Sequence, residues 1–155
     1  MAYRVPIGGG PRQPLFADPT RLPPRFELTS VSPDERWVVG TYADPSSAGL
    51  AVVPIDEPGP VRRFPYTYTP FANRPGSFGG TWAPGGQAIE DLVYRDGAVN
   101  LWRIPLDGSA PRPVTTFTSE QMMDYQWSRD GKTLAVSRGT QSADIVLITS
   151  DDRKE

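Results

Sequence analysis

Short apolar blocks separated by turn residues run along the whole chain, and this pattern predicts β-strands joined by tight turns. The blocks are rich in Val, Ile, Leu, Trp and Tyr, and Gly, Pro, Asp or Ser bounds each one. Residues 50–53 and 145–148 are continuously apolar, so we expect sheets that are covered on both faces. The predicted strands are 37–42, 50–54, 92–94, 99–104, 122–127, 133–137 and 144–148.

The turn and strand blocks recur along the chain. A small residue, a turn and an apolar run follow one another in residues 32–39, 83–89 and 128–136, at intervals of about 45 to 50 residues. A second block, in which a proline ends a strand, recurs at residues 4–7, 52–55 and 103–106 and more loosely at 147–150. The hairpin turns are predicted at Asp96-Gly97, Asp107-Gly108 and Asp130-Gly131, where glycine supplies the positive φ.

A repeat of this length with four short strands is typical of one blade of a β-propeller. We therefore predict an all-β fold, a single partial β-propeller of about three four-stranded antiparallel blades in an open, incomplete ring. A two-layer β-sandwich is the alternative. The approximate repeats are 1–30, as the tail of a preceding blade, then 31–80, 81–126 and 127–150, followed by a polar tail at 151–155.

The amino-acid composition excludes several kinds of catalytic and metal site. The 155 residues include 15 Gly and 18 Pro, which disfavours long helices, and they include neither Cys nor His. Ser-His-Asp triads, thiol nucleophiles, disulfides and histidine metal ligands are therefore excluded. We expect no catalytic residue, no metal site and no cofactor. The formal net charge of −2 predicts no nucleic-acid partner, and no apolar stretch is long enough to span a bilayer, so this segment is expected to make no membrane contact.

Three stretches, 81–87, 94–108 and 126–132, together resemble TolB-type, WD-repeat-like β-propellers. The closing run, 137–148, resembles the C-terminal end of the propeller region attached to bacterial transmembrane serine/threonine kinases. The resemblance extends over most of the chain from about Ser30 onward. It implies a binding or sensing segment in an extracytoplasmic or periplasmic location, with any kinase chemistry elsewhere in the parent protein.

Propellers have typically 4 to 8 blades, and at about 45 to 50 residues per repeat this chain holds only a little over three. The faces of the end blades would expose apolar area and unpaired strand edges. We expect self-association, or blades upstream of this chain, to cover those faces. The favoured interpretation is the C-terminal part of a longer protein, and a natural half-propeller is the alternative.

The connection between the first two full repeats, residues 58–80, is long and rich in Pro, aromatic and Arg side chains. Binding residues concentrate on such loops, and Tyr, Phe, Arg and Asn suit recognition. The alternative is a strand and loop that tuck their rings against the sheets. A polar hairpin at 138–142 is a further candidate. The candidate binding residues are Arg63, Tyr66, Tyr68, Phe71, Asn73, Arg74, Phe78, Arg138 and Gln141.

Glu90 and Asp91 are adjacent carboxylates where the other repeats carry strand residues. Strand neighbours point to opposite faces, so the two are unsuited to chelate one ion or to act as an acid–base pair. We interpret them as strand-end residues in solvent or paired with Arg95, and the alternative is that one lines a channel. Trp82 and Trp127 precede equivalent turns, where packing between blades is favoured over an aromatic ligand platform.

Three functions stay open. The first is a non-catalytic propeller segment that binds or senses a protein or a small molecule through loops at the blade ends. The second is the accessory propeller of a prolyl-oligopeptidase-like hydrolase, which requires an α/β-hydrolase domain with a Gly-x-Ser-x-Gly motif. The third is a half-ring whose only role is assembly.

Overall fold

The computed structural model describes residues 2–56, 59–65 and 79–140, which form antiparallel β-sheets. Within these ranges the helical structure is one turn of 3-10 helix, η1 (Pro19–Arg21). It begins where the Asp18 carboxylate accepts a hydrogen bond from the backbone N–H of Thr20. The all-β prediction is confirmed, and no sheet of the described residues closes on itself.

A short hairpin opens the chain. β1 (Tyr3–Arg4) pairs antiparallel with β2 (Gln13–Pro14). The Arg4 guanidinium donates to both carboxylate oxygens of Asp56, at 2.7 and 2.8 Å, and so ties the hairpin to the end of a strand in the next sheet.

The first four-stranded sheet is a meander in the order β3–β4–β5–β6. Its strands are β3 (Glu27–Val31), β4 (Trp37–Ala43), β5 (Ala48–Pro54) and β6 (Arg62–Pro65). β4 and β5 pair along their whole length, from Trp37 opposite Pro54 to Ala43 opposite Ala48. Residues 50–53 of β5 are each at most 3% exposed, so the prediction that this run is covered on both faces is confirmed.

The second four-stranded sheet repeats this meander with β7 (Thr81–Trp82), β8 (Ala88–Arg95), β9 (Ala98–Pro105) and β10 (Arg112–Pro113). Asp96 and Gly97 join β8 to β9 with positive φ angles of 53° and 87°, which confirms the predicted hairpin. β8 extends well beyond the predicted strand 92–94 towards the N-terminus.

A two-stranded sheet follows, made of β11 (Gln121–Trp127) and β12 (Leu134–Gly139). The register of this pair shifts between Met122 and Asp124, so Met123 has no partner across the pair. The predicted strand 144–148 lies outside the described residues.

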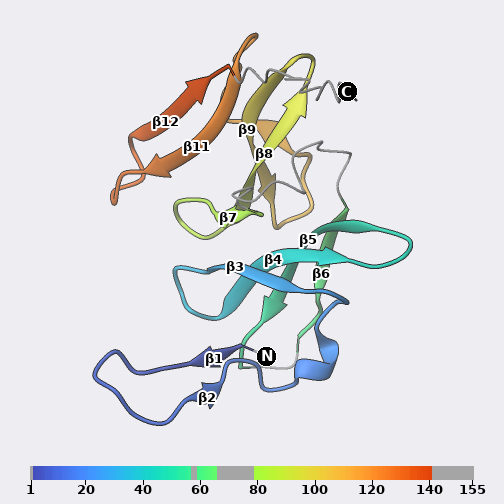
Figure 1. Cartoon of the computed structure of the whole chain (residues 1–155), viewed down its shortest axis with the longest axis vertical. Coiled ribbons are helices and arrows are strands. Elements are labelled where there is room, and N and C mark those ends of the chain that lie inside the picture. The colour runs from blue at the N-terminus through green and yellow to red at the C-terminus, as the bar shows by residue number, and fades with distance from the viewer. Residues whose placement is uncertain (1, 57–58, 66–78, 141–155) are drawn as a thin grey trace, which may run out of the picture.

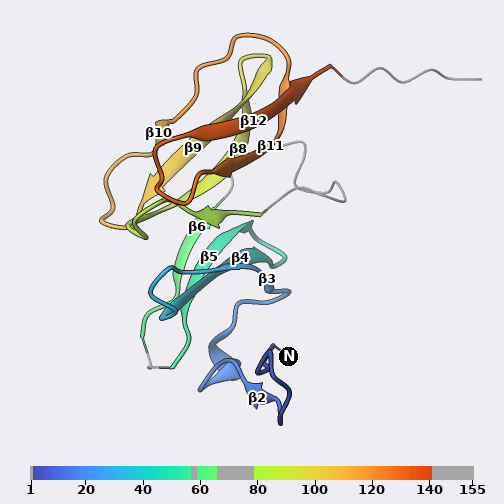
Figure 2. The ribbon, with the colours of Figure 1, turned by 90° about the vertical axis from the view of Figure 1, so that its left-hand side faces the viewer.

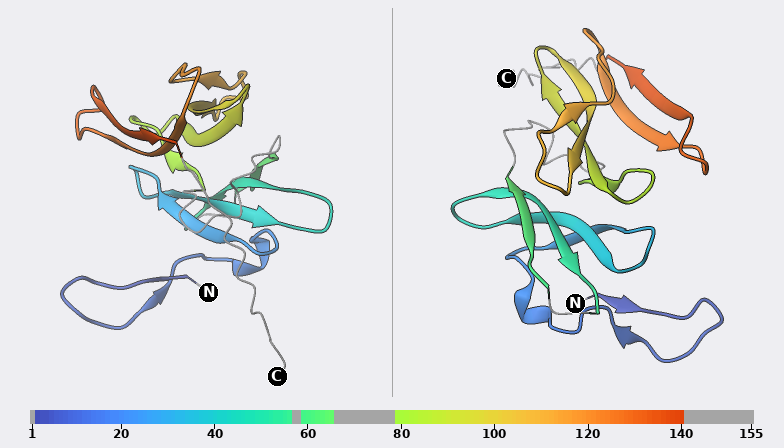
Figure 3. Two further views of the ribbon diagram at one scale, coloured as in Figure 1. Left: turned by 45° about the horizontal axis from the view of Figure 1, so that its top comes forward. Right: turned by 180° about the vertical axis from the view of Figure 1, so that it is seen from behind.

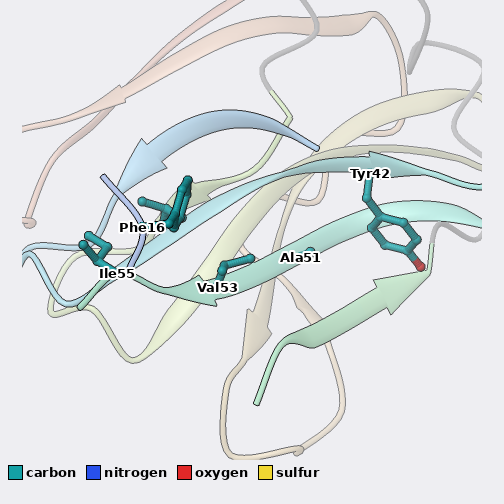
Figure 4. Close-up of a cluster of buried hydrophobic side chains, with 6 residues drawn as sticks. Phe16, Tyr42, Ala51, Val53 and Ile55 are labelled. Carbon is teal, nitrogen blue, oxygen red and sulfur yellow. The ribbon is translucent and has the colours of Figure 1, made fainter. Parts of the chain in front are cut away.

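Successive sheets pack on one another along the longest axis of the molecule (Figure 1). The first apolar cluster lies between the N-terminal segment and the β3–β6 sheet, where Tyr42, Ala51 and Val53 of β4 and β5 meet Phe16. Figure 4 shows these side chains together with Ile55. The N-terminal segment thus covers one face of the first four-stranded sheet.

Two more clusters continue the stack, and the turned view in Figure 2 shows the order of the sheets that they join. Leu50 and Val52 of β5 pack against Trp82 and Ile89 of the second sheet. Leu101 of β9 then belongs to a cluster with residues of β11 and β12. Both four-stranded sheets are therefore covered on their two faces. Trp82 packs within the second cluster, as the packing interpretation predicts.

The same turn is built three times between the first and second strands of successive sheets. Residues 32–37, 83–88 and 128–133 are each closed by a backbone hydrogen bond between their end residues, at 2.8, 3.0 and 2.8 Å. In the first and third turns a serine hydroxyl donates at 2.6 Å to the aspartate two residues later and accepts the last N–H at 2.9 Å. Three turns closed in the same way therefore join the first two strands of these three sheets.

These turns also stack on one another. A Cβ atom added to Gly86 would lie 3.4 Å from the Pro33 ring, and one added to Gly131 would lie 2.7 Å from the Pro84 Cβ. Each turn glycine therefore lies against the turn proline of the preceding sheet. The rear view in Figure 3 shows the three sheets following one another in this order.

Candidate functional site

Most of the predicted binding residues fall outside the described residues. Arg63 and Arg138 are described, and they lie on β6 and β12, in different sheets. The structure therefore does not bring these two together. The predicted residues outside the described ranges are Tyr66, Tyr68, Phe71, Asn73, Arg74, Phe78 and Gln141.

Arg138 contacts three residues of the segment that precedes β11. Its guanidinium carbon lies 3.6 Å from the centre of the Phe117 ring, and the group donates a hydrogen bond of 2.8 Å to the carbonyl oxygen of Ser119. The Glu120 carboxylate lies 3.3 Å from the same guanidinium. These contacts use both the charge and the planar face of Arg138. The side chain thus fixes the segment that leads into β11.

Arg63 lines a cavity of about 530 Å³ between the two four-stranded sheets. Phe64 of β6 contributes to one wall, and Asp91 and Trp102 of β8 and β9 contribute to the other. A cavity of this size accommodates a small molecule, and apolar walls with few polar groups are typical of such sites.

The charge of Arg63 has a partner on its own sheet. Its guanidinium lies 3.6 Å from the Asp44 carboxylate and 5.2 Å from the centre of the Tyr42 ring. Hydrogen bonds from the Ser46 hydroxyl and backbone and from the Ser47 amide lower the pKa of Asp44, so this carboxylate is ionised at neutral pH. Arg63 therefore brings little net charge to the cavity.

Asp91 is the buried polar group of this cavity. The residue is 7% exposed, and its carboxylate accepts a 2.9 Å hydrogen bond from the backbone N–H of Leu92. Burial raises the pKa of Asp91 from 3.8 to about 7, although the amides of Leu92 and Gly80 oppose that shift. Among the described residues no cation forms a salt bridge with it.

Trp102 and Arg95 complete the polar side of the cavity. Trp102 lies directly across the strand pair from Asp91, so both side chains emerge on the same face of the sheet. Arg95 shares that face because it is four residues from Asp91 along β8. Its guanidinium carbon lies 5.5 Å from the centre of the Trp102 ring. A carboxylate, an aromatic ring and a guanidinium therefore line one wall.

No protein-family model matches this sequence, and no curated protein matches it.

The expectation that Glu90 lies in solvent or pairs with Arg95 is wrong. Glu90 is fully buried, and the guanidinium of Arg103 across the strand pair donates to its Oε1 through Nε at 2.8 Å and through Nη2. Trp127 of β11 donates its indole N–H to the other carboxylate oxygen at 2.7 Å. Glu90 thus joins the second four-stranded sheet to the β11–β12 sheet.

The solvent interpretation is equally wrong for Asp91, because the stacked sheets enclose the middle of β8. The expectation that the two carboxylates face opposite ways is confirmed. Glu90 points towards β11, and Asp91 lines the cavity shared with β6. They have separate environments and do not act as a pair.

A second polar contact joins the same two sheets. The hydroxyl groups of Thr81 on β7 and Tyr125 on β11 lie 2.6 Å apart. Burial raises the pKa of Tyr125, and the nearby carboxylates of Glu90 and Asp91 add to that shift. The phenol is therefore neutral at neutral pH, and it positions the first strand of one sheet against the next.

Within the described ranges, no cluster of three or more His, Cys, Asp or Glu side chains is arranged to hold a metal ion. No helix in the described part of the chain has the length and hydropathy needed to cross a membrane.

The sequence contained one signal for the cavity that our interpretation missed. Ile89 and Leu92 flank the two carboxylates, and a carboxylate in the middle of a strand covered on both faces must be buried. The role of Trp102 had no comparable local signal. That role depends on which sheet packs against β9, and the packing of one sheet on another is not visible in the local sequence around Trp102.

Proposed function

We propose that this chain is a non-catalytic β-propeller segment that binds a ligand in the cavity between its two four-stranded sheets. The observation that carries this proposal is Asp91, a buried carboxyl that lines a cavity of about 530 Å³ and has no cationic partner among the described residues. A buried charge without a partner is costly, and such groups are concentrated at functional sites.

The propeller interpretation is supported by the repeated construction of the sheets. In it, β3–β6 and β7–β10 are two blades and β11–β12 belong to a third. Two meanders of the same strand order and three equivalent turns agree with this interpretation. Binding between adjacent blades then follows the general preference of ligands for junctions between structural units.

The resemblance of residues 137–148 to kinase-attached propellers supports a parent protein of the receptor-kinase type, with this segment outside the cytoplasm. The reading frame that encodes this segment tests this parentage. A kinase domain and a membrane helix upstream would support it. An α/β-hydrolase domain downstream would instead favour the accessory propeller of a prolyl-oligopeptidase-like enzyme.

Ligand binding is tested with a fragment library and the full chain, by following backbone amide shifts of β6, β8 and β9 in NMR spectra. Val93 lines the cavity, so Val93→Trp is expected to fill it and abolish the shifts. Val136 is exposed on β12, so Val136→Trp is the matched control and should leave them unchanged. The binding proposal fails if no fragment shifts these amides, or if Val93→Trp binds as well as the unmodified chain.

A further inference from the structure

The cavity is lined by one acidic and one basic side chain, Asp91 and Arg95, that form no salt bridge with another described residue. Asp91 supplies one negative charge when it ionises, and Arg95 supplies one positive charge that no described acidic side chain neutralises. Arg63 is already paired with Asp44. A ligand that pairs with both Asp91 and Arg95 must therefore carry one positive and one negative group.

The depths of Asp91 and Arg95 in the cavity indicate how the two charged groups of a ligand would be oriented. The Asp91 carboxyl is the buried end of the wall, and Arg95 is exposed and stacked over Trp102. The positive group of a ligand would therefore lie deep and the negative group nearer the rim. Phe64 and Ile104 offer apolar surface beside them. Ammonium is the cation that a single carboxylate recognises most simply, and guanidinium is suited to a carboxylate.

We propose that the cavity binds a small zwitterion with an apolar side chain, namely an α-amino acid or a dipeptide. Its ammonium group pairs with Asp91, its carboxylate pairs with Arg95, and its side chain packs on Trp102, Phe64 and Ile104. This inference rests on the proposed binding function and specifies the ligand class.

The pH dependence of binding distinguishes this ligand from a simple anion. Because the pKa of Asp91 is about 7, only about a tenth of the free protein carries the carboxylate at pH 6, and about nine tenths carries it at pH 8. The affinity for an ammonium ligand should therefore rise about tenfold between these pH values. The affinity for a ligand with only an anionic group should fall.

Other charged and titratable groups lie near Asp91. Arg63 of β6 and Tyr94 and Arg95 of β8 line the same cavity, whereas Tyr125 of β11 and the Glu90–Arg103 pair lie on the other face of the sheet. Burial raises the pKa of Tyr125, so its phenol stays neutral across the range from pH 6 to pH 8. Asp91 is therefore the group expected to set the pH dependence.

Three ligands that differ by one group each test the proposal by isothermal titration calorimetry at pH 8. L-Phenylalanine has both charges, phenethylamine lacks the carboxylate, and 3-phenylpropionate lacks the ammonium group. L-Phenylalanine is expected to bind at least tenfold more tightly than either analogue. The dipeptide phenylalanyl-alanine tests the second source of the same chemistry, and the tighter of the two zwitterions identifies the natural class.

Variants assign each contact. At pH 8, Asp91→Asn should weaken L-phenylalanine at least tenfold and should strengthen 3-phenylpropionate, because it removes a carboxylate that repels an anion. Arg95→Gln should weaken L-phenylalanine but not phenethylamine. Asp124→Asn is the matched control, because Asp124 is an exposed strand carboxylate that also accepts the N–H of the following residue, at 2.6 Å. It should leave all affinities unchanged.

The outcomes separate the two proposals. If library fragments bind in the cavity but neither zwitterion does, or if 3-phenylpropionate binds as tightly as L-phenylalanine, the ligand class is wrong and the binding function stands. A zwitterion whose affinity does not depend on Asp91 also overturns the ligand class. If nothing binds in the cavity, both proposals fail.

Discussion

At the scale of single residues, Asp91 is the group whose chemistry differs most from its usual behaviour. Its pKa is raised from 3.8 to about 7 by burial, so the folded chain holds a proton that the unfolded chain releases between these pH values. Ionisation of this carboxyl works against folding. A buried carboxyl without a cationic partner lowers the stability of the fold, and residues that lower stability in this way are typical of functional sites.

The stability of the chain should therefore fall as the pH rises through the window set by Asp91. Relative to Asp91→Asn, the free energy of unfolding is expected to fall by about 2–3 kcal/mol between pH 5 and pH 8. Urea denaturation of both proteins at the two pH values measures this difference. Parallel pH profiles for the two proteins would show that Asp91 titrates normally in the folded state.

Glu90 presents the opposite case, a buried carboxylate whose partners are all in place. Replacing Arg103 by Leu would leave this charge buried with only the indole N–H of Trp127. We expect Arg103→Leu to destabilise the fold by about 3–5 kcal/mol, because an uncompensated buried charge is costly. Chemical denaturation measures the loss.

Arg112 gives a matched control for that variant. It lies opposite Arg103 on the neighbouring strand β10 and is exposed. Arg112→Leu should therefore change stability by less than about 0.5 kcal/mol. The double variant Glu90→Leu, Arg103→Leu should recover much of the loss. A similar loss in all three variants would mean that shape, not charge, dominates at this position.

At the scale of elements, the repeated turns set how closely the sheets approach. Gly131 has a φ of 69° and lies against Pro84, whereas Gly97 has a φ of 87° and faces open space. Both positions suit glycine, but only the first also lies at a contact between sheets.

Alanine at the two glycines separates these contributions. Gly97→Ala should cost about 1 kcal/mol from backbone strain alone. Gly131→Ala should cost at least about 1 kcal/mol more, because its Cβ would lie 2.7 Å from the Pro84 Cβ. Thermal denaturation of the two variants compares them directly, and equal losses would contradict a tight contact between the turns.

The elements were largely predictable from the sequence, and the site was not. Strand β5 and the Asp96-Gly97 hairpin follow from local rules, because an apolar run and a residue pair that accepts positive φ are visible without knowing the fold. The burial of Glu90 and Asp91 depends on what covers each face of β8. That cover is supplied by β5 and β6 on one side and by β11 on the other, far away in the sequence.

At the scale of the whole molecule, the described sheets form a stack in which an apolar cluster joins each sheet to the next. Such arrays derive their stability from the individual units and from the interfaces between adjacent units. The four-stranded sheets have an interface on both faces, whereas β12 carries exposed residues at 135–138. Protection is therefore expected to decrease from the inner sheets towards β11 and β12.

Native-state hydrogen exchange tests this gradient. Amides of β4, β5, β8 and β9 should exchange most slowly, and those of β12 should exchange faster. Ile89→Ala should cost about 2–5 kcal/mol and lower protection in both four-stranded sheets together, because Ile89 is fully buried in the cluster that joins them. Leu134→Ala, at the edge of the third cluster, should affect β11 and β12 alone. If Ile89→Ala lowers protection only within its own sheet, the two sheets fold independently, and a cavity between them would lack the fixed walls that ligand recognition requires.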